Sequence, residues 1–221
     1  MKKRCFRSTW LSWRPRVCLF HGLLTPDECA ALIRVAGARL GGCEVNAPSK
    51  RDRRSSEACW IPRSDLREVW QNERHRRLVA RVEERVAHAT GFPIYHGEPP
   101  QMLRYSCGAE YTCHPDFFDP EDRRALANGG QRCATVLIYL NNVASDAGGA
   151  TYFPEARLRV QPAVGDALLF FNTHPDGSID PSSVHAGEPV LRPDAVKWVL
   201  SKWLRARRFE VDCRGFRAQR W

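Results

Sequence analysis

The chain has 221 residues, of which 43% are hydrophobic and 27% charged, and its formal net charge is +9. This length suits one well-buried domain better than two. No run of apolar residues is long enough to cross a membrane, and residues 17–24 are too short and too interrupted for the core of a signal peptide. The sequence therefore predicts a cytoplasmic protein without a membrane span.

Nine cysteines are scattered along the chain at irregular spacings. No two of them form the Cys-x-x-Cys pair that is typical of zinc sites and thioredoxin-like redox motifs. Free cysteine commonly packs as a small apolar residue, and Cys18, Cys29 and Cys133 lie inside apolar segments. We therefore expect mostly reduced thiols, with Cys113 on the strand face opposite to that of its neighbour His114.

Arginine supplies most of the positive charge, in three clusters at residues 51–54, 74–85 and 205–220. Basic character favours acidic partners such as anionic metabolites, acidic proteins or nucleic acid. The middle cluster alternates with glutamates, which is more typical of a solvated helix face. The last cluster contains aromatic residues and fits either a polyanion-binding tail or a frayed terminus, of which we favour the second.

Two helices are predicted in the first half of the chain. Residues 25–28 read Thr-Pro-Asp-Glu, which gives a capping box with proline at the first helical position. This helix should end near Gly37 or Gly41. A second helix is expected from about Glu73 to Thr90, with Gly91 as its stop. Its apolar residues share one side and should face the core: Leu78, Val79, Val82 and Val86.

After Gly91 the pattern changes from helical to extended. Short strand-like runs, separated by turn residues, are expected at 102–105, 135–140, 167–171 and 196–204. Helices followed by many short strands predict an α+β fold with a mainly β core, an antiparallel barrel or jelly roll buttressed by N-terminal helices. We divide the chain into a basic N-terminal segment (1–14), one folded domain (15–205) and a basic C-terminal tail (206–221).

The residues that carry chemistry are His114-Pro115-Asp116, His185 and Lys197. In an extended strand, residues two apart point the same way, so His114 and Asp116 can reach one ion. Two imidazoles and a carboxylate can hold Fe(II) by one face and leave the opposite face open. Lys197 lies among apolar residues, where lysine is rarely found without a partner, and could pair with a carboxylate of a small dicarboxylic acid. Taken alone, His-x-Asp is a weak signal, because it more often marks a surface pair.

Longer stretches around these residues carry further motifs. They are residues 103–105, 111–118, 129–132, 134–140, 148–149, 153–154, 165–171, 185–187, 197–198 and 202–203. In this order they resemble the prolyl 4-hydroxylase family of Fe(II)- and 2-oxoglutarate-dependent dioxygenases. The resemblance covers most of residues 15–205 and marks this part as the dioxygenase domain.

The resemblance implies a double-stranded β-helix with His114, Asp116 and His185 as catalytic residues and iron ligands. Lys197 would pair with the C5 carboxylate of 2-oxoglutarate. Hydrogen-bonding neighbours of that carboxylate would be Tyr105 and Thr135, although a core tyrosine and a strand threonine are the plainer alternatives. The resemblance also implies decarboxylation of 2-oxoglutarate to succinate and CO2, with O2 as co-substrate and ascorbate as reductant. Asp116 favours hydroxylation, because the related halogenases lack this carboxylate.

The chain departs from the family pattern in three places. Arg205 stands eight positions after Lys197, where relatives often have a histidine near the C1 carboxylate of the keto acid; arginine can make a bidentate contact there. Ala150 follows the paired glycines where glutamate is common. The spacing between His185 and Lys197 is longer than usual. Lys197 is still the better candidate, because Lys202 would face the opposite side of the strand.

Two loops, residues 46–58 and 117–130, flank the iron motif and are predicted either to close over a substrate or to be plain surface connections. Candidate substrate contacts are Arg54, Trp60 and Arg132, although an arginine in a loop is by default solvated.

Hydroxylation of a proline residue in a protein or peptide is the leading hypothesis. The alternatives are hydroxylation of a free amino acid or other small metabolite, since fold and cofactor do not fix the substrate, and a nucleic-acid-binding oxidative demethylase. Of these partners, nucleic acid is the least expected. A non-catalytic module is disfavoured, because all three ligands and the lysine are present.

Overall fold

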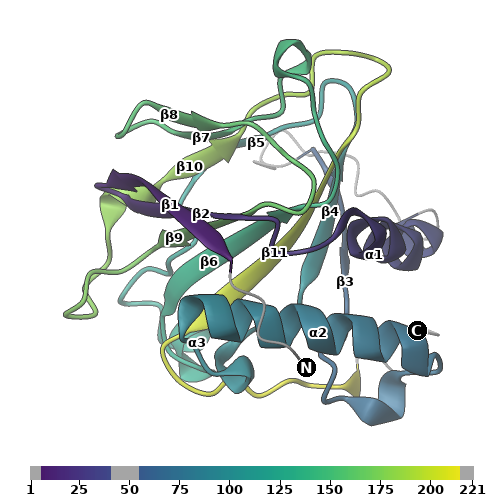
Figure 1. Cartoon of the computed structure of the whole chain (residues 1–221). Coiled ribbons are helices and arrows are strands. Elements are labelled where there is room, and N and C mark those ends of the chain that lie inside the picture. Colours follow the sequence, from purple (N-terminus) through teal and green to yellow (C-terminus); the bar gives the residue numbers. More distant parts are fainter. Residues whose placement is uncertain (1–5, 41–54, 215–221) are drawn as a thin grey trace.

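The computed structural model describes residues 6–40 and 55–214 (Figure 1). Within these residues, eleven strands form two antiparallel sheets. The strands are β1 (Arg7–Trp13), β2 (Arg16–His21), β3 (Glu57–Trp60), β4 (Gln101–Tyr105), β5 (Tyr111–His114), β6 (Arg132–Tyr139), β7 (Thr151–Phe153), β8 (Leu158–Val160), β9 (Ala167–Phe171), β10 (His185–Gly187) and β11 (Lys197–Arg205). The large sheet has the order β1-β2-β9-β6-β11-β4-β3 and the small sheet the order β5-β10-β7-β8.

The two long helices pack against the large sheet. The helices are α1 (Pro26–Leu40), α2 (Glu73–Thr90) and the short α3 (Arg123–Ala127), with 3₁₀ turns η1 (Arg67–Val69), η2 (Ile94–His96), η3 (Ser145–Ala147) and η4 (Pro181–Ser183). Figure 1 shows α2 beneath the large sheet and the small sheet on the opposite side. No helix in the described part of the chain is long and apolar enough to span a membrane.

Two groups of buried apolar side chains hold these layers together. The first joins α1 and α2 to one face of the large sheet, and the second fills the space between the two sheets. Strand β11 contributes to both, because Leu200 and Leu204 face the helices while Val199 faces the small sheet. This arrangement confirms the predicted α+β fold with a mainly β jelly-roll core.

Both predicted helices are confirmed, together with their capping. Thr25 Oγ1 accepts the backbone N–H of Glu28 at 3.2 Å, and Glu28 Oε2 accepts the N–H of Thr25 at 2.9 Å, as in a capping box. Helix α2 has the predicted bounds, with Asn72 as N-cap and Gly91, at φ 77°, as C-cap. Its four predicted inward residues are buried.

The four predicted strands are confirmed as β4, β6, β9 and β11, of which β9 has the predicted bounds. Strand β1 lies inside the expected N-terminal segment 1–14, yet it pairs with β2 along residues 7–13. Five of its seven residues are exposed, so it lacks the apolar alternation that marks a strand. Beyond β11, the N–H groups of Arg207 and Phe209 donate to the carbonyl oxygens of Gly129 and Tyr95. The folded part of the chain therefore starts before residue 15 and continues past residue 205.

Candidate active site

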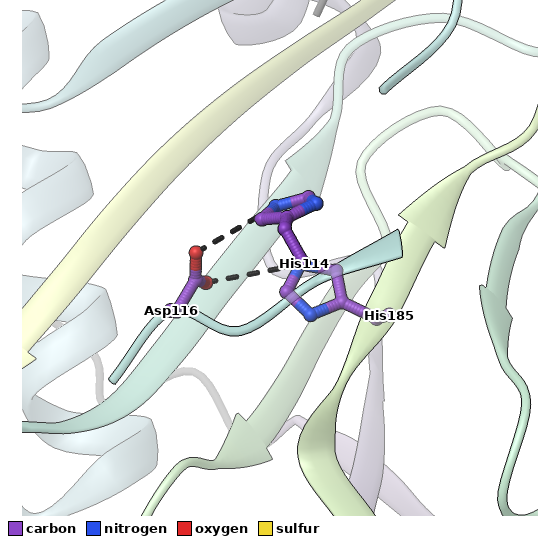
Figure 2. Close-up of side chains that lie close together, drawn as sticks. All are labelled: His114, Asp116 and His185. Atoms are coloured by element: carbon purple, nitrogen blue, oxygen red, sulfur yellow. Dashed lines mark ion pairs between the residues drawn. The ribbon is translucent and has the colours of Figure 1, made fainter. Parts of the chain in front are cut away.

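The three candidate iron ligands meet where β5 and β10 pair. His114 ends β5, His185 begins β10, and the two residues are partners in the strand register. Asp116 follows two residues after His114; its Oδ1 lies 3.8 Å from His114 Nε2 and its Oδ2 lies 3.8 Å from His185 Nε2 (Figure 2). All three residues are buried. Among the described residues, this is the one group of histidine, cysteine or carboxylate side chains arranged so that it could hold a metal ion.

Hydrogen bonds orient both imidazoles for binding a metal. His114 Nδ1 lies 2.7 Å from the carbonyl oxygen of Thr112, and His185 Nδ1 lies 3.1 Å from that of Ser183. A carbonyl oxygen only accepts, so each Nδ1 carries the proton and each Nε2 presents a lone pair. The Tyr111 ring stacks on His114 with 3.4 Å between ring centroids. Two histidine nitrogens and one carboxylate that face a common point from the same side form a ligand set that suits Fe(II).

The Asp116 carboxylate is oriented by a relay of two buried side chains. Thr135 Oγ1 donates to Asp116 Oδ2 at 2.7 Å, and Asn172 Nδ2 donates to Thr135 Oγ1 at 2.9 Å. Because a carboxylate can only accept, the hydroxyl proton points to Asp116 and the hydroxyl oxygen receives the amide. The resemblance implies that Thr135 contacts 2-oxoglutarate, but the structure gives its hydroxyl to the iron ligand instead.

The charge state of Asp116 follows from its neighbours. Burial by itself raises the pKa of this carboxyl, but His185, His114, Arg132 and the Thr135 hydroxyl outweigh burial and hold the pKa below its usual value. Asp116 is therefore ionised at neutral pH, which is the form that binds a metal.

Lys197 lines the same cavity, which has a volume of about 510 Å³. It is buried at the start of β11, opposite Tyr105 in the register, and its Nζ lies 5.0 Å from the centre of the Tyr105 ring. Within the described residues its ammonium has no ion-pair partner. Burial lowers the pKa of Lys197 to about 7, against a smaller opposing effect of Glu188. A buried cation of this kind is suited to receive an anionic group of a ligand.

Lys202 has the orientation expected for it. Its Nζ lies 2.9 Å from Glu83 Oε1 of α2, on the helix side of the large sheet, and both side chains are buried. The alternation of side chains along β11 therefore sends Lys197 into the cavity and Lys202 to the helices.

Sequence reasoning missed the hydroxyl of Thr151. This residue of β7 lines the same cavity as Lys197 and accepts a hydrogen bond from the buried hydroxyl of Tyr139 at 2.9 Å. The chain reaches β7 through Gly148, where φ is 71° and a Cβ would lie 2.3 Å from the carbonyl oxygen of Pro189. The glycine pair before Thr151 was a usable signal, because it marks a tight turn directly before a strand.

The remaining predicted contacts divide into two groups. Trp60 and Arg132 line the cavity, and Trp203 lies between them with its ring centre 5.5 Å from that of Trp60. Arg205 is not among the cavity-lining residues of the described chain, so its expected contact with 2-oxoglutarate is not borne out by the geometry. Its buried guanidinium is instead bound by Glu98 and by backbone carbonyl groups. Arg54, with most of the loop 46–58, lies outside the described residues.

The loop 117–130 contains α3 and contributes no cavity-lining residue within the described chain. Its closure over a substrate stays a prediction. Cys113 is exposed while His114 beside it is buried, which confirms that they face opposite sides of β5.

Comparisons with known proteins point to one family. The 2OG-Fe(II) oxygenase superfamily matches residues 100–205. Prolyl 4-hydroxylase 5 of Arabidopsis thaliana is 36% identical over 91% of this chain and 72% of its own length, and probable prolyl 4-hydroxylase 6 is 37% identical over 92% and 73%.

Solved structures share the fold. The viral collagen prolyl hydroxylase of Paramecium Bursaria Chlorella virus-1, in complex with 2OG, has a TM-score of 0.66 and 23% identity over 92% of this chain and 97% of that one. A prolyl hydroxylase from Trichoplax adhaerens, in complex with a hypoxia inducible factor peptide fragment, has a TM-score of 0.60 and 19% identity over 91% and 86%. From its sequence relatives, its fold and its His-Asp-His site, the chain belongs to the prolyl 4-hydroxylase family of Fe(II)- and 2-oxoglutarate-dependent dioxygenases.

Proposed function

We propose that this enzyme hydroxylates a proline residue in a protein or peptide. The observation that carries the proposal is the buried His114, Asp116 and His185 group, which shares one cavity with the buried amino group of Lys197. Iron(II) bound there together with 2-oxoglutarate supplies the oxidising power to insert one oxygen atom of O2 into a C–H bond, while 2-oxoglutarate loses CO2 and becomes succinate.

The residues divide the work between two sides of the cavity. His114, Asp116 and His185 hold the iron, and the Nδ1 bonds of the histidines keep their Nε2 atoms available. Lys197 binds the distal carboxylate of 2-oxoglutarate, and burial makes this pairing strong because little water competes for it. Thr151, which lines the cavity, adds the hydroxyl contact that the resemblance assigns to Thr135.

The substrate side of the cavity suits a proline ring. Trp60 and Trp203 line the cavity, and the Arg132 guanidinium lies 4.2 Å from the centre of the Trp203 ring. An apolar pyrrolidine ring packs on an indole face, while a guanidinium donates to the carbonyl groups of a peptide. The peptide bound by a relative of the same fold supports a peptide substrate.

Two finer features belong to the same proposal. Ascorbate would keep the iron ferrous between turnovers, as in the family that the chain resembles. A cytoplasmic location is supported by the seven described cysteines, which are free thiols and persist best in a reducing compartment. Turnover that stays the same without ascorbate, or fractionation of the protein outside the cytoplasm, would contradict these features.

The test is to incubate the iron-loaded protein with 2-oxoglutarate and a panel of proline-containing peptides, following succinate and peptide mass together. We expect one peptide to gain one oxygen atom per succinate, and the same peptide with alanine in place of proline to gain none. The Asp116→Ala variant should release no succinate above background. Oxygen added to free proline or another free amino acid, but to no peptide, would favour the small-metabolite alternative.

A further inference from the structure

A buried charge cluster beside the cavity joins one cavity-lining residue, Arg132, to two residues that have no role in the function proposed above. Its members are Glu98, Arg132 and Arg205. Glu98 Oε1 accepts hydrogen bonds from Arg132 Nε at 2.6 Å and from Arg205 Nη1 at 3.1 Å, and Glu98 Oε2 accepts one from Arg132 Nη2 at 2.8 Å. Glu98 and Arg205 are buried. One carboxylate thus holds two guanidinium groups, of which only that of Arg132 reaches the cavity.

Strand pairing brings the two arginines together. Leu204 of β11 is opposite Ala134 of β6, so regular pairing would put Cys133 opposite Arg205. The register shifts at this point and places Arg132 there instead. Directly opposed residues of an antiparallel pair project from the same face of a sheet. The bulge therefore turns Arg132 to the same side as Arg205.

Arg205 also fixes the loop 117–130. Its Nη2 donates to the carbonyl oxygen of Ala125 at 2.8 Å and to that of Asn128. Gly129 has φ 79°, and a Cβ there would lie 3.1 Å from both Cβ and Nε of Arg205. The end of the loop therefore packs closely against this side chain, in a left-handed backbone conformation that favours glycine.

Phe118 connects the start of the same loop to both arginines. Its ring centre lies 4.7 Å from the guanidinium carbon of Arg205 and 4.8 Å from that of Arg132. Its backbone N–H and carbonyl are both bound by the Gln131 side chain. Contacts between guanidinium groups and aromatic faces are attractive, so they favour one arrangement of ring and arginine.

We propose that Arg205 is a positioning residue for the peptide substrate: it fixes the loop 117–130 and, through Glu98 and Phe118, holds the guanidinium of Arg132, which lines the cavity. Arg205 contacts neither 2-oxoglutarate nor the peptide. The inference rests on the proposed prolyl hydroxylation, because it concerns the side of the cavity that receives the peptide.

The experiment compares Arg205→Met, which removes the donors, with Arg205→Lys, which keeps the charge and carries the test if the methionine variant does not fold. Arg208→Met is the control, because Arg208 is an exposed arginine of the same segment, paired with Glu210. Backbone hydrogen exchange in residues 123–130 is measured for each protein. Binding of 2-oxoglutarate to the Mn(II)-loaded protein is followed by calorimetry, and KM is determined for any oxidised peptide.

For Arg205→Met we expect the exchange rate in the loop and the KM for the peptide to rise by about tenfold. Losing the hydrogen bonds of a charged group changes an equilibrium constant by about this factor. The exchange rate and KM of Arg205→Lys should lie between those of the wild type and those of Arg205→Met. Arg208→Met should have the values of the wild type. The dissociation constant for 2-oxoglutarate should stay within about twofold, because no shared contact links it to Arg205.

Two results would overturn the proposal. One is unchanged exchange together with about tenfold weaker 2-oxoglutarate binding, which would make Arg205 a co-substrate contact. The other is no change in exchange or in peptide KM. If the wild-type protein oxidises no peptide, the proposed function fails, while the exchange and 2-oxoglutarate measurements still decide what Arg205 holds.

Discussion

At the scale of single residues, the site depends on side chains that orient other side chains. Asp116 has one oxygen fixed by Thr135, and Asn172 in turn fixes the Thr135 hydroxyl. Within the described part of the chain, Asn172 Oδ1 is buried without a hydrogen-bond partner, while Asn172 Nδ2 donates to Thr135. Partners of this kind usually change metal affinity when they are removed, although they do not touch the metal.

Replacing Thr135 with valine should therefore weaken metal binding by about 10- to 100-fold. Valine has nearly the same shape but lacks the hydroxyl, so Asp116 and Asn172 both lose a partner. Thr135→Ser keeps the hydroxyl and should bind metal like the wild type. Titration of each protein with Mn(II) by calorimetry measures the effect. Equal affinity for the valine and serine variants would show that the relay does not orient Asp116.

Lys197 should make 2-oxoglutarate binding dependent on pH. Its pKa is about 7 without ligand, so below that pH it is already an ammonium and affinity should be flat. Above about pH 7, binding of the dianion must take up a proton, and affinity should fall by about tenfold per pH unit.

Calorimetry in two buffers with different ionisation enthalpies measures this proton uptake on the Mn(II)-loaded protein. Lys197→Arg is the matched control, since arginine stays charged and its binding should not vary over this range. A wild-type affinity that is constant from about pH 6 to about pH 9 would contradict the lowered pKa.

At the scale of elements, β11 couples the cavity to the helices. Val199, Ser201 and Trp203 line the cavity, while the alternate residues face α1 and α2. Lys202 is on the helix side, where Glu83 of α2 binds it and also accepts the N–H and hydroxyl of Ser64. Buried ion pairs add little net stability, but breaking one leaves an uncompensated charge.

Glu83→Gln and Lys202→Met should each lower the free energy of unfolding by roughly 3 kcal/mol, since each leaves one buried charge without its partner. The double variant should lose clearly less than the sum, because no lone charge remains. Urea denaturation gives these values. Arg77→Met, which removes an exposed pair with Glu73, should change little. Additive losses in the double variant would argue against coupling between Glu83 and Lys202.

At the scale of the whole molecule, apolar packing joins the sheets and helices through two groups of buried residues. The metal site lies against the second group, since the ring centre of His185 lies 4.5 Å from that of Phe170 and 5.7 Å from that of Phe153. The fold should therefore survive without metal, while ligands that bind only the folded state should raise its stability.

Mn(II) at about 100 times its dissociation constant should add about 2.7 kcal/mol, a rise in Tm of roughly 5–10 °C. Adding 2-oxoglutarate should raise Tm further, and a chelator should return it to the starting value with an unchanged circular dichroism spectrum. Lys197→Met should keep the gain from metal and lose the gain from 2-oxoglutarate. Unfolding by the chelator, or an unchanged 2-oxoglutarate gain in Lys197→Met, would contradict this separation.

Local patterns predicted those parts of the fold whose signals lie within one segment. Helix α2 has its predicted bounds because its apolar periodicity and the glycine that ends the helix both lie within one continuous stretch of the sequence. Strands β7 and β8 span three residues each, which is too short for an alternation to be read. The bulge between β6 and β11 is a property of pairing between two distant segments, so no local pattern reports it.

By itself, the sequence determined the chemistry that depends on residue type and spacing: two histidines and an aspartate for the metal, and a lysine for a carboxylate. Only the tertiary structure decided which other side chains serve that chemistry. It assigned Thr135 to Asp116, placed Thr151 in the cavity and bound Arg205 to Glu98, outside the cavity lining of the described residues. The physical reason is that hydrogen-bond partners in this fold come from strands far apart in the chain, and their register determines which atoms meet.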